Sequence, residues 1–332
     1  MIVVTGGAGF IGSNLIHELN RIGENEIFCV DNLRNNSAKF LNLQDAVFCD
    51  YMDKVEFRRA IASRALSAKR IRAILHEGAC SNTLQDDGAY MMDNNFTCSK
   101  ELLHYALQNR IPFVYASTAA VYGLSQRFSP EPENEQPLNV YGFSKLAFDN
   151  YVRRLLPTID STVVGLRYFN VYGKREQHKG RMASVAHHFT TQLKDSGVIR
   201  MFQGSGGYGN GEQRRDFVYV RDLCRMNLFF AGLGDEKSRA AMGRMQETYQ
   251  GIFNAGTGAS RSFNDVANAL LQIQQSKGGV TCNGKIEYIP FPADLAGRYQ
   301  HFTEADTTLL QQQGGYSRPF TTLEEGIAET FA

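Results

Sequence analysis

The stretch Thr5-Gly6-Gly7-Ala8-Gly9-Phe10-Ile11-Gly12 decides the fold of this chain. It follows the apolar run at 2–4 and precedes apolar residues at helical spacing over 15–19. The order is therefore strand, tight glycine-rich turn and helix. Three of the glycines fit the spacing G-x-G-x-x-G: Gly7, Gly9 and Gly12.

Glycine at these positions lets the chain turn sharply, lets the backbone approach a pyrophosphate, and lets the helix pack close to the strand. The helix N-terminus then offers free N–H groups and a positive dipole end to the phosphates. Alone, the motif is also compatible with a glycine-rich loop that holds no ligand. An acid follows at the expected place, because Asp31 ends the apolar run at 27–30, 19 residues after Gly12. We therefore predict a dinucleotide-binding half.

Composition limits the class of protein. The 332 residues suit a large α/β domain with a second, smaller part. The 35 Lys and Arg residues nearly balance the 34 Asp and Glu residues, so we expect neither nucleic-acid binding nor a basic membrane surface. No apolar run approaches the length of a membrane span. A strand that begins at residue 2 leaves no room for a signal peptide, so we expect a cytoplasmic protein.

The six cysteines are scattered, and none forms a C-x-x-C pair. We expect free, mostly buried thiols in a reducing cytosol, with neither disulfides nor a metal site. The cysteines are Cys29, Cys49, Cys80, Cys98, Cys224 and Cys282.

Further apolar runs predict the remaining strands of a doubly wound parallel sheet. A third strand is expected over 46–49, with Asp50 at its end over the adenine, a fourth over 71–75 and a fifth over 113–116. The fifth ends in Ser117-Thr118, whose hydroxyls either bond a substrate or cap the strand end. In such sheets the carboxyl edge holds the ligand.

A turn of small residues, 76–81, follows the fourth strand at that edge. Its first two residues, His76 and Glu77, permit two interpretations. They are an acid–base pair, or they make the turn hydrogen bonds that are more usual for polar residues at strand ends.

Tyr141 and Lys145 share one face of a predicted helix, because they are four residues apart. A phenol has a reference pKa of about 10, and a nearby ammonium together with a positive nicotinamide favours the phenolate. Lowering this pKa by three units asks for about 4 kcal/mol of differential interaction. A Tyr-x-x-x-Lys pair is common in helices by chance. Here a glycine motif and a strand-end Ser-Thr precede it, and together they make it a strong indication of a catalytic pair.

The residues near Asp31 leave the cofactor open. An acid alone at this position favours NAD, because it accepts from the ribose 2′-hydroxyl and repels a 2′-phosphate. Asn32, Arg34 and Lys39 supply a neutral donor and positive charge nearby. From the residues alone, NADP and NAD are equally supported.

The second part of the chain carries candidate groups for a substrate. Lys179 lies in a basic, glycine-bearing loop before a helix predicted over 182–193, and the residues alone favour a solvent-exposed lysine. A flexible glycine loop precedes Arg214 and Arg215 and can bring a bidentate guanidinium to a diphosphate. Arg298-Tyr299 offers a second clamp for the same group. The segment 215–220 then returns to the large domain.

At this point the chain resembles the extended short-chain dehydrogenase/reductase superfamily, through its glycine turn, Thr118 and Tyr141-x-x-x-Lys145. More narrowly, it resembles the ADP-L-glycero-D-manno-heptose 6-epimerases, nearly end to end. The segments that carry this likeness are 51–54, 76–81, 90–95, 167–173, His178-Lys179-Gly180, 291–292 and 297–300.

The resemblance implies a Rossmann-type α/β fold and tightly held NADP, with ADP-heptose as the substrate and a role in building the lipopolysaccharide inner core. It also implies a homo-oligomer such as a pentamer. The implied catalytic residues are Tyr141, Lys179, Lys145 and Thr118. The implied cofactor residues are Gly6, Gly9, Phe10, Ile11, Gly12, Asp31, Asn32, Lys39, Lys54, Glu77, Gly78, Ala79, Cys80, Ser81, Asn94, Lys145 and Val171. The implied substrate residues are Asn170, Arg181, His188, Phe202, Gln203, Gly204, Ser205, Arg215 and Tyr299.

Arg181 departs from the family, which commonly has serine there, and three loops look longer than usual: 204–216, 234–249 and 277–285. We expect an NADP-binding domain over 1–170, rejoined by about 217–250, and a mainly substrate-binding domain over 171–332.

Three rival functions differ in the residues they need. A nucleotide-sugar 4,6-dehydratase carries an Asp-Glu pair where this chain has Ala119-Ala120. A 4-epimerase is a second rival. A non-catalytic dinucleotide-binding module has little need of Tyr141 and Lys145 together.

Overall fold

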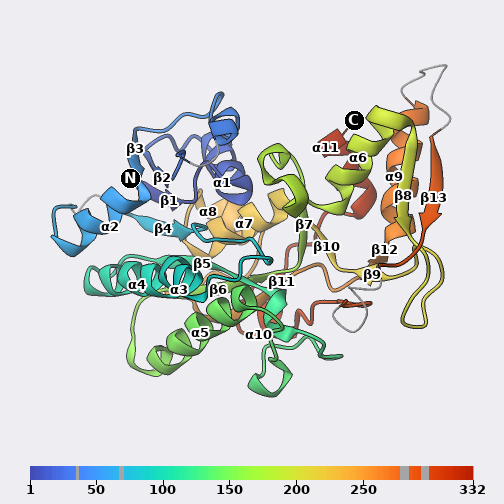
Figure 1. Cartoon of the computed structure of the whole chain (residues 1–332). Helices are drawn as coiled ribbons and strands as arrows, with labels where there is room; N and C mark the ends of the chain where they lie inside the picture. Colours follow the sequence, from blue (N-terminus) through green and yellow to red (C-terminus); the bar gives the residue numbers. More distant parts are fainter. Residues whose placement is uncertain (35–36, 67–70, 277–283, 293–298, 332) are drawn as a thin grey trace.

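The computed structural model describes residues 1–34, 37–66, 71–276, 284–292 and 299–331. Within these residues, seven parallel strands form one sheet in the order β11-β6-β5-β4-β1-β2-β3, which confirms the predicted fold class (Figure 1). The strands are β1 (Ile2–Thr5), β2 (Ile27–Asp31), β3 (Asp50–Asp53), β4 (Ala73–His76), β5 (Phe113–Thr118), β6 (Val163–Tyr168) and β11 (Gln250–Ala255).

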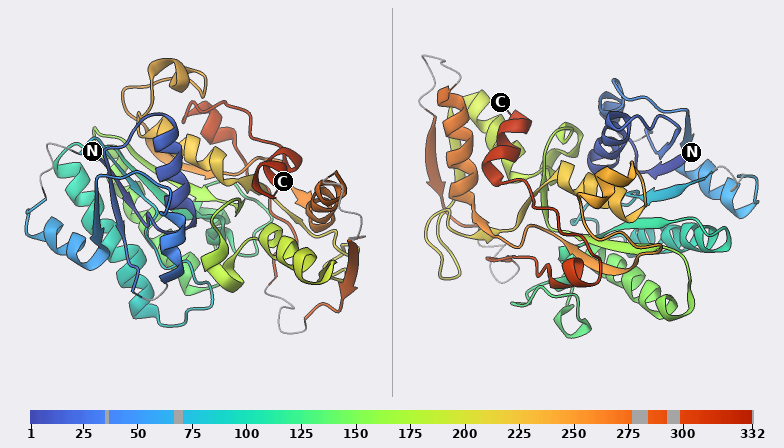
Figure 2. Two further views of the ribbon diagram at one scale, coloured as in Figure 1. Left: turned by 90° about the horizontal axis from the view of Figure 1, so that it is seen from above. Right: turned by 180° about the vertical axis from the view of Figure 1, so that it is seen from behind.

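Helices cover both faces of this sheet (Figure 2). The strands read as continuous apolar runs because successive side chains enter opposite cores: Ile2 and Val4 enter one, and Val3 enters the other. The first core includes side chains of α1 (Phe10–Arg21) and α7 (Val220–Phe230). The second includes side chains of α2 (Lys54–Ala62), α4 (Cys98–Gln108) and α5 (Val140–Leu155).

The third strand is displaced from its predicted place. It runs from Asp50 to Asp53 and pairs with Phe28–Asp31, so Asp50 begins the strand instead of ending it. The predicted run 46–49 precedes it, and Val47 is 53% exposed. Hydrophobicity misplaced this element because β3 is an edge strand, whose residues need not be apolar. The carboxylate of Asp53 caps α2 by accepting from the Val55 N–H at 2.9 Å.

A smaller α/β unit stands beside the carboxyl edge of the sheet (Figure 1). Its first helix begins at Val185, three residues later than predicted, because the Ser184 hydroxyl caps it by accepting from the His187 N–H at 3.2 Å. The elements of this unit are α6 (Val185–Ser196), β8 (Val198–Phe202), α9 (Phe263–Ser276), β13 (Lys285–Ile289) and α11 (Leu323–Phe331).

Two short strand pairs connect the units. They are β7 (Asn170–Tyr172) with β10 (Phe217–Tyr219), and β9 (Arg214–Arg215) with β12 (Arg261–Ser262). Elsewhere in the described chain lie the short α-helices α3 (Gly88–Met92), α8 (Glu236–Ala240) and α10 (Thr308–Gln312), and the short 3-10 or π-helical turns η1 (Ser37–Asn42), η3 (Asp93–Thr97), η4 (Ala119–Tyr122), η5 (Pro132–Asn134), η6 (Leu156–Thr158) and η7 (Gln177–Met182).

The cysteines in the described residues are free thiols, as expected, but they differ in burial. Cys29 and Cys224 are buried, whereas Cys49 is exposed. Cys282 lies outside the described residues. Among the helices the structure describes, we find none with both the length and the apolar character that a membrane crossing requires.

Candidate active site

A cavity of about 920 Å³ opens at the carboxyl edge of the sheet, between the sheet and the smaller unit. It is lined by every residue that the family resemblance implies for the cofactor or for catalysis, whereas Gly7 of the glycine turn and Asp50, expected over the adenine, are not among the lining residues. Tyr90, Met182, Phe217 and Phe263 also line it, and sequence reasoning had not assigned them. The structure therefore brings the predicted groups together at one place, and their roles remain predictions.

The glycine-rich turn has the shape that a pyrophosphate needs. Gly6 has φ of +66°, and a Cβ there would lie 2.8 Å from the Gly78 backbone nitrogen. A Cβ on Gly12 would lie 2.1 Å from the Gly6 carbonyl oxygen. Gly9 caps α1 without a side-chain hydrogen bond, so the first N–H groups of the helix face the cavity uncapped. These residues fit the phosphates of a dinucleotide.

Asp31 is held at the end of β2 by three donors. One oxygen accepts from the Ala8 N–H at 2.8 Å, and the other accepts from the Asn32 N–H at 2.6 Å and from Lys39 Nζ at 2.9 Å. The carboxylate is therefore paired with a cation within the site, and its repulsion of a nearby anion is reduced.

Tyr141 and Lys145 lie on the first turns of α5, which Asn139 caps by accepting from the Gly142 N–H at 2.8 Å. Tyr141 makes a hydrogen bond with the Thr118 hydroxyl. Lys145 is buried and donates through Nζ to the Ala116 carbonyl at 2.7 Å. Both side chains thus meet the carboxyl end of β5.

The pKa shifts of Tyr141 and Lys145 differ from those that the sequence led us to expect. Burial raises the pKa of Tyr141, and the hydrogen bond from Thr118 only partly opposes this rise. Burial also lowers the pKa of Lys145 to about 8, against the negative charges of Glu77 and Asp149. Without a cofactor the phenol is therefore protonated, and the nearby ammonium alone does not produce a phenolate.

Lys179 enters the same cavity from a separate loop, η7 (Gln177–Met182). Its ammonium lies 5.0 Å from the centre of the Phe10 ring, and burial lowers its pKa. Gly180, with φ of +52°, allows the turn that follows it. Glu176 holds the loop together by accepting from the Ser184 N–H at 2.5 Å and from the Ser184 hydroxyl at 2.7 Å. The solvent-exposed interpretation of Lys179 is wrong.

His76 is part of the scaffold. Its Nδ1 bonds the Thr5 hydroxyl at 2.7 Å, and its Nε2 bonds the Ser99 hydroxyl at 2.9 Å. Burial, together with Lys145, lowers its pKa to about 3, so it stays neutral. With both ring nitrogens bonded inside the fold, His76 is not free to act as half of an acid–base pair with Glu77.

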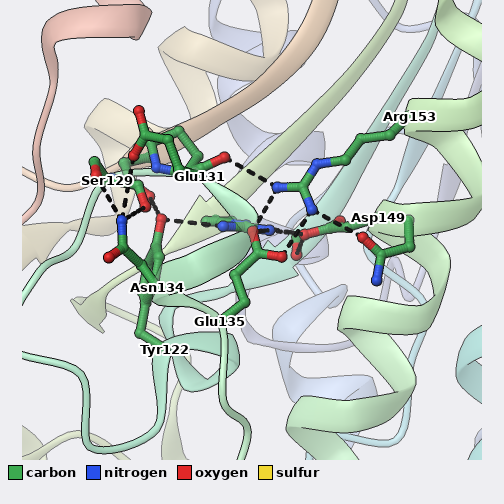
Figure 3. Close-up of polar contacts among 12 residues, drawn as sticks. Tyr122, Ser129, Glu131, Asn134, Glu135, Asp149 and Arg153 are labelled. Atoms are coloured by element: carbon green, nitrogen blue, oxygen red, sulfur yellow. Dashed lines mark hydrogen bonds and ion pairs between the residues drawn. The ribbon is translucent and has the colours of Figure 1, made fainter.

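A buried cluster of charges lies beneath α5 and is largely drawn in Figure 3. Asp149, four residues after Lys145, accepts from the Tyr115 hydroxyl at 3.0 Å, the Ser117 hydroxyl at 2.9 Å and Arg167 Nε at 2.9 Å. Ser117 therefore binds Asp149, while its neighbour Thr118 faces the cavity. These bonds hold α5 in register with β5 and β6.

The same cluster reaches the loop before α5. Arg167 also donates to Glu135 at 2.6 Å. The carboxylate of Glu135 also accepts from both terminal nitrogens, Nη1 and Nη2, of Arg153 (Figure 3). Arg167 and Asp149 are fully buried, and their charges pair. Sequence reasoning missed the cluster, although Asp149 continues the Tyr141–Lys145 face of the helix at the same spacing of four.

Arg215, a predicted substrate residue, is buried and is not itself among the residues that line the cavity. Its guanidinium lies 4.9 Å from the centre of the Tyr299 ring and 5.7 Å from that of Phe263, which lines the cavity. Among the described residues, no carboxylate lies within ion-pairing distance of it. A buried cation that has aromatic rings beside it, and no charge partner among the described residues, suits a phosphate group.

Arg214 does not share this role. Its guanidinium donates to the Ser260 carbonyl at 2.5 Å and to the Ser260 hydroxyl at 3.2 Å. The neighbouring arginines point to opposite sides of β9, as successive residues in a strand do. Arg298, the other half of the predicted second clamp, lies outside the described residues.

The remaining predicted substrate residues divide into two groups. Phe202 packs on Phe291, which packs on Tyr299, with ring centres 5.5 and 5.2 Å apart. Gln213 ties the following loop by donating to the Gln203 carbonyl and the Ser205 hydroxyl, both at 3.1 Å. Within the described structure Asn170 lines the cavity, whereas residues 202–205, Arg181 and His188 are not among the residues that line it, and Arg181 is exposed.

Comparisons with known proteins agree with this arrangement. Residues 2–243 match the NAD dependent epimerase/dehydratase family. The ADP-L-glycero-D-manno-heptose-6-epimerase of Alkalilimnicola ehrlichii is 51% identical over 328 residues, which cover 98% of this chain and 95% of that protein.

Two crystal structures are also similar. The Helicobacter pylori ADP-L-glycero-D-manno-heptose-6-epimerase aligns with a TM-score of 0.79 at 28% identity, covering 99% of this chain and 94% of that chain. The Thermotoga maritima UDP-glucose 4-epimerase with UDP-glucose aligns with a TM-score of 0.73 at 28% identity, covering 99% of this chain and 97% of that one.

Proposed function

The chain belongs to the NAD dependent epimerase/dehydratase family, and from this premise we propose that it interconverts ADP-D-glycero-D-manno-heptose and ADP-L-glycero-D-manno-heptose at C6. The observation that carries the proposal is that Tyr141 and Lys179 face one cavity from separate elements. Inversion through a ketone needs an acid/base group on each face of the carbon. Two such groups on separate elements of one cavity are suited to that need.

Tyr141 takes the proton of the C6 hydroxyl in one epimer, and Lys179 gives a proton to the oxygen when the other epimer forms. The nicotinamide supplies a hydride acceptor that is restored at the end of each cycle. Between the two proton transfers the 6-keto sugar turns to present its other face. Thr118 orients Tyr141, and Lys145 supplies positive charge beside it. No external reductant is consumed, since the product is an isomer of the substrate.

We also propose NADP as the resident cofactor. Lys39 bonds Asp31 at 2.9 Å and so compensates the carboxylate that would otherwise repel a 2′-phosphate. Lys54 donates to the Asn94 side chain at 2.6 Å, and both residues line the cavity. The uncapped start of α1 suits the pyrophosphate.

The substrate's diphosphate is assigned to Arg215. Tyr299 and Phe263 lie beside its guanidinium, and Nη1 donates to the Arg214 carbonyl at 2.9 Å, so the remaining N–H donors are assigned to the phosphate oxygens. Substrate and cofactor then meet at Tyr141.

Elimination of water is the rival chemistry of this family. The positions after Thr118 are Ala119 and Ala120, which offer no acid for proton abstraction. We therefore expect no product lighter by one water from any nucleotide hexose. Detection of such a product by mass spectrometry would contradict the epimerase assignment.

The test removes each base separately. Tyr141→Phe keeps the ring, and Lys179→Met keeps the stem without the ammonium. Each variant should retain cofactor and lose epimerase activity by two to four powers of ten, roughly the contribution of one positioned acid/base. Activity is followed by NMR of ADP-heptose. Lys174→Met, at an exposed lysine of the same segment, is the matched control and should keep parent activity.

A single-turnover assay separates the two roles. Protein loaded with reduced cofactor is mixed with the 6-keto analogue of ADP-heptose, and the ratio of the two epimeric products is measured. The two variants should shift this ratio in opposite directions. Epimerisation by Lys179→Met at near the parent rate would refute the second-base assignment.

A further inference from the structure

The loop that carries Lys179 is fastened to the cofactor-binding turn through one buried side chain, Asn42. Asn42 ends the short helix η1 (Ser37–Asn42), three residues after Lys39. It is 0% exposed, although it lies on an irregular surface segment between β2 and β3. A buried amide must find hydrogen-bond partners, because an unmet polar group costs about 1–3 kcal/mol.

The side chain of Asn42 meets partners from two distant segments. Its Nδ2 donates to the Ala8 carbonyl in the glycine-rich turn at 3.0 Å, and also to His178 Nδ1 at 3.0 Å. Its Oδ1 accepts from Gln177 Nε2 at 2.8 Å. Gln177 and His178 directly precede Lys179 in the chain. The Asn42 side chain therefore connects two segments: the glycine turn, which is expected to hold the pyrophosphate, and the loop that carries Lys179.

Only one orientation of this amide satisfies all three partners. The Ala8 carbonyl can only accept and so must face the NH₂ group, while the Gln177 amide nitrogen can only donate and so must face the oxygen. His178 accepts at Nδ1 only in its neutral form. Burial, followed by the charges of Lys39 and Lys179, lowers the pKa of His178 to about 4 and keeps it neutral.

A second tie runs parallel to the first. Asn14, in the second turn of α1, donates through Nδ2 to the Lys174 carbonyl at 2.9 Å and to the Phe10 carbonyl at 2.8 Å. Phe10 is also the ring on which the Lys179 ammonium lies. The segment from Lys174 to Lys179 is thus mounted on α1 and η1, at both of its ends.

We propose that Asn42 is a positioning residue that makes the placement of Lys179 depend on the cofactor-binding turn. The inference rests on the proposed use of Lys179 as the second acid/base. A dinucleotide whose phosphates contact the glycine turn, and whose adenosine end contacts Lys39, orders both neighbours of Asn42. Asn42 transmits that order to Gln177 and His178, and Lys179 is held at the reacting carbon only when the cofactor is in place.

The first test uses the single-turnover product ratio. Asn42→Ala should slow formation of the Lys179-dependent epimer by about ten- to a hundredfold, the usual effect of a small misplacement of a catalytic group. Formation of the Tyr141-dependent epimer should change by no more than about twofold. The product ratio should move in the same direction as in Lys179→Met. A purely structural role would slow both half-reactions alike.

Two further variants protect the test against misfolding. Gln177→Ala removes one tie from an exposed position and should shift the ratio in the same direction by a smaller factor. Asn20→Ala is the matched control. Asn20 also ties α1 to the segment before β3, through hydrogen bonds with the Val47 backbone at 2.8 and 2.9 Å, but it does not touch the Lys179 loop. It should leave the ratio unchanged.

A second readout does not depend on activity. Amide hydrogen exchange of the peptide covering 174–184 is measured with and without NADP. Cofactor should slow exchange in the parent by about tenfold or more, an effect that Asn42→Ala should abolish and Asn20→Ala should preserve.

The outcomes distinguish this inference from the function it rests on. If Lys179→Met leaves the product ratio unchanged, the two-base mechanism fails. If Lys179→Met shifts the ratio but Asn42→Ala and Gln177→Ala do not, the coupling through Asn42 is refuted. Equal protection of 174–184 by NADP in the parent and in Asn42→Ala would refute it as well.

Discussion

Replacing Glu77 by glutamine should make the cofactor-free protein more stable relative to the parent at pH 8 than at pH 5, while weakening the predicted catalytic site. One carboxylate oxygen of Glu77 accepts from the Tyr168 hydroxyl at 2.9 Å. The other is enclosed without a hydrogen-bond partner in the described structure. Burial raises the pKa of Glu77 to about 7, against the opposing effects of the Tyr168 hydrogen bond and the Lys145 charge.

The magnitude follows from the difference between the folded and unfolded pKa values. A rise from 4.5 to about 7 corresponds to about 3 kcal/mol, at about 1.4 kcal/mol per unit. Because the cleft before Glu77 admits solvent, which screens the charge, we expect roughly 1–3 kcal/mol. The folded state binds the proton more tightly, so this contribution is complete below pH 4.5 and is lost as the pH rises through about 7. Glutamine does not ionise, so the stability of the Glu77→Gln variant does not fall in this way as the pH rises.

The assay is urea unfolding of parent and Glu77→Gln without cofactor, at pH 5 and at pH 8. The amide nitrogen of glutamine has the same unmet hydrogen bond at both pH values, so its cost cancels in the comparison. The variant should gain roughly 1–3 kcal/mol relative to the parent between the two pH values. Glu133→Gln, at an exposed position, should gain nothing. An equal effect of Glu77→Gln at both pH values would refute the reasoning.

Activity should move in the opposite direction. Glu77 is the largest of the negative charges that raise the pKa of Lys145, which burial lowers to about 8. Without this carboxylate Lys145 loses its proton at a lower pH. The alkaline limb of the pH–rate profile should therefore shift to lower pH in Glu77→Gln, and an unshifted limb would show that Lys145 does not set it.

Three further predictions concern charge partners. Lys39→Glu should raise the Kd of NADP more than that of NAD in a fluorescence titration, because it inverts the charge beside Asp31; equal losses would show that Lys39 does not read the 2′-phosphate. Arg215→Lys should raise KM for ADP-heptose by about tenfold or more with little change in kcat, since lysine lacks the planar fork that stacks and binds phosphate; a fall in kcat alone would contradict this. Asp149→Asn should lower the free energy of unfolding by about 3 kcal/mol, because Arg167 stays buried with one charge partner fewer, and a urea titration that shows less than about 1 kcal/mol would contradict it.

Features that depend on a few neighbouring residues could be predicted from the sequence. The glycine turn is one, because backbone conformation and close approach at Gly6 and Gly12 exclude any side chain there. The buried strands are another, since a parallel sheet covered on both faces requires continuous apolar runs. Tyr141 and Lys145 are a third, because helical spacing alone places them side by side.

The edge of the sheet shows where this local reasoning ends. β3 has no apolar signature, because an edge strand packs little of its surface, and the pattern was assigned to residues 46–49 instead. What decides its position is the pairing of its backbone with Phe28–Asp31.

Only the tertiary structure decided which polar groups would be buried and with what partners. Lys179 becomes a half-buried group of the cavity because its loop is bound to Asn42, more than a hundred residues earlier in the chain. Arg214 and Arg215 look alike in sequence, but the guanidinium of Arg214 donates to Ser260, whereas that of Arg215 lies beside the Tyr299 ring. The pKa of Tyr141 rises because packing removes water from the phenol. Burial and partner choice are set by segments that meet only on folding, so no local pattern records them.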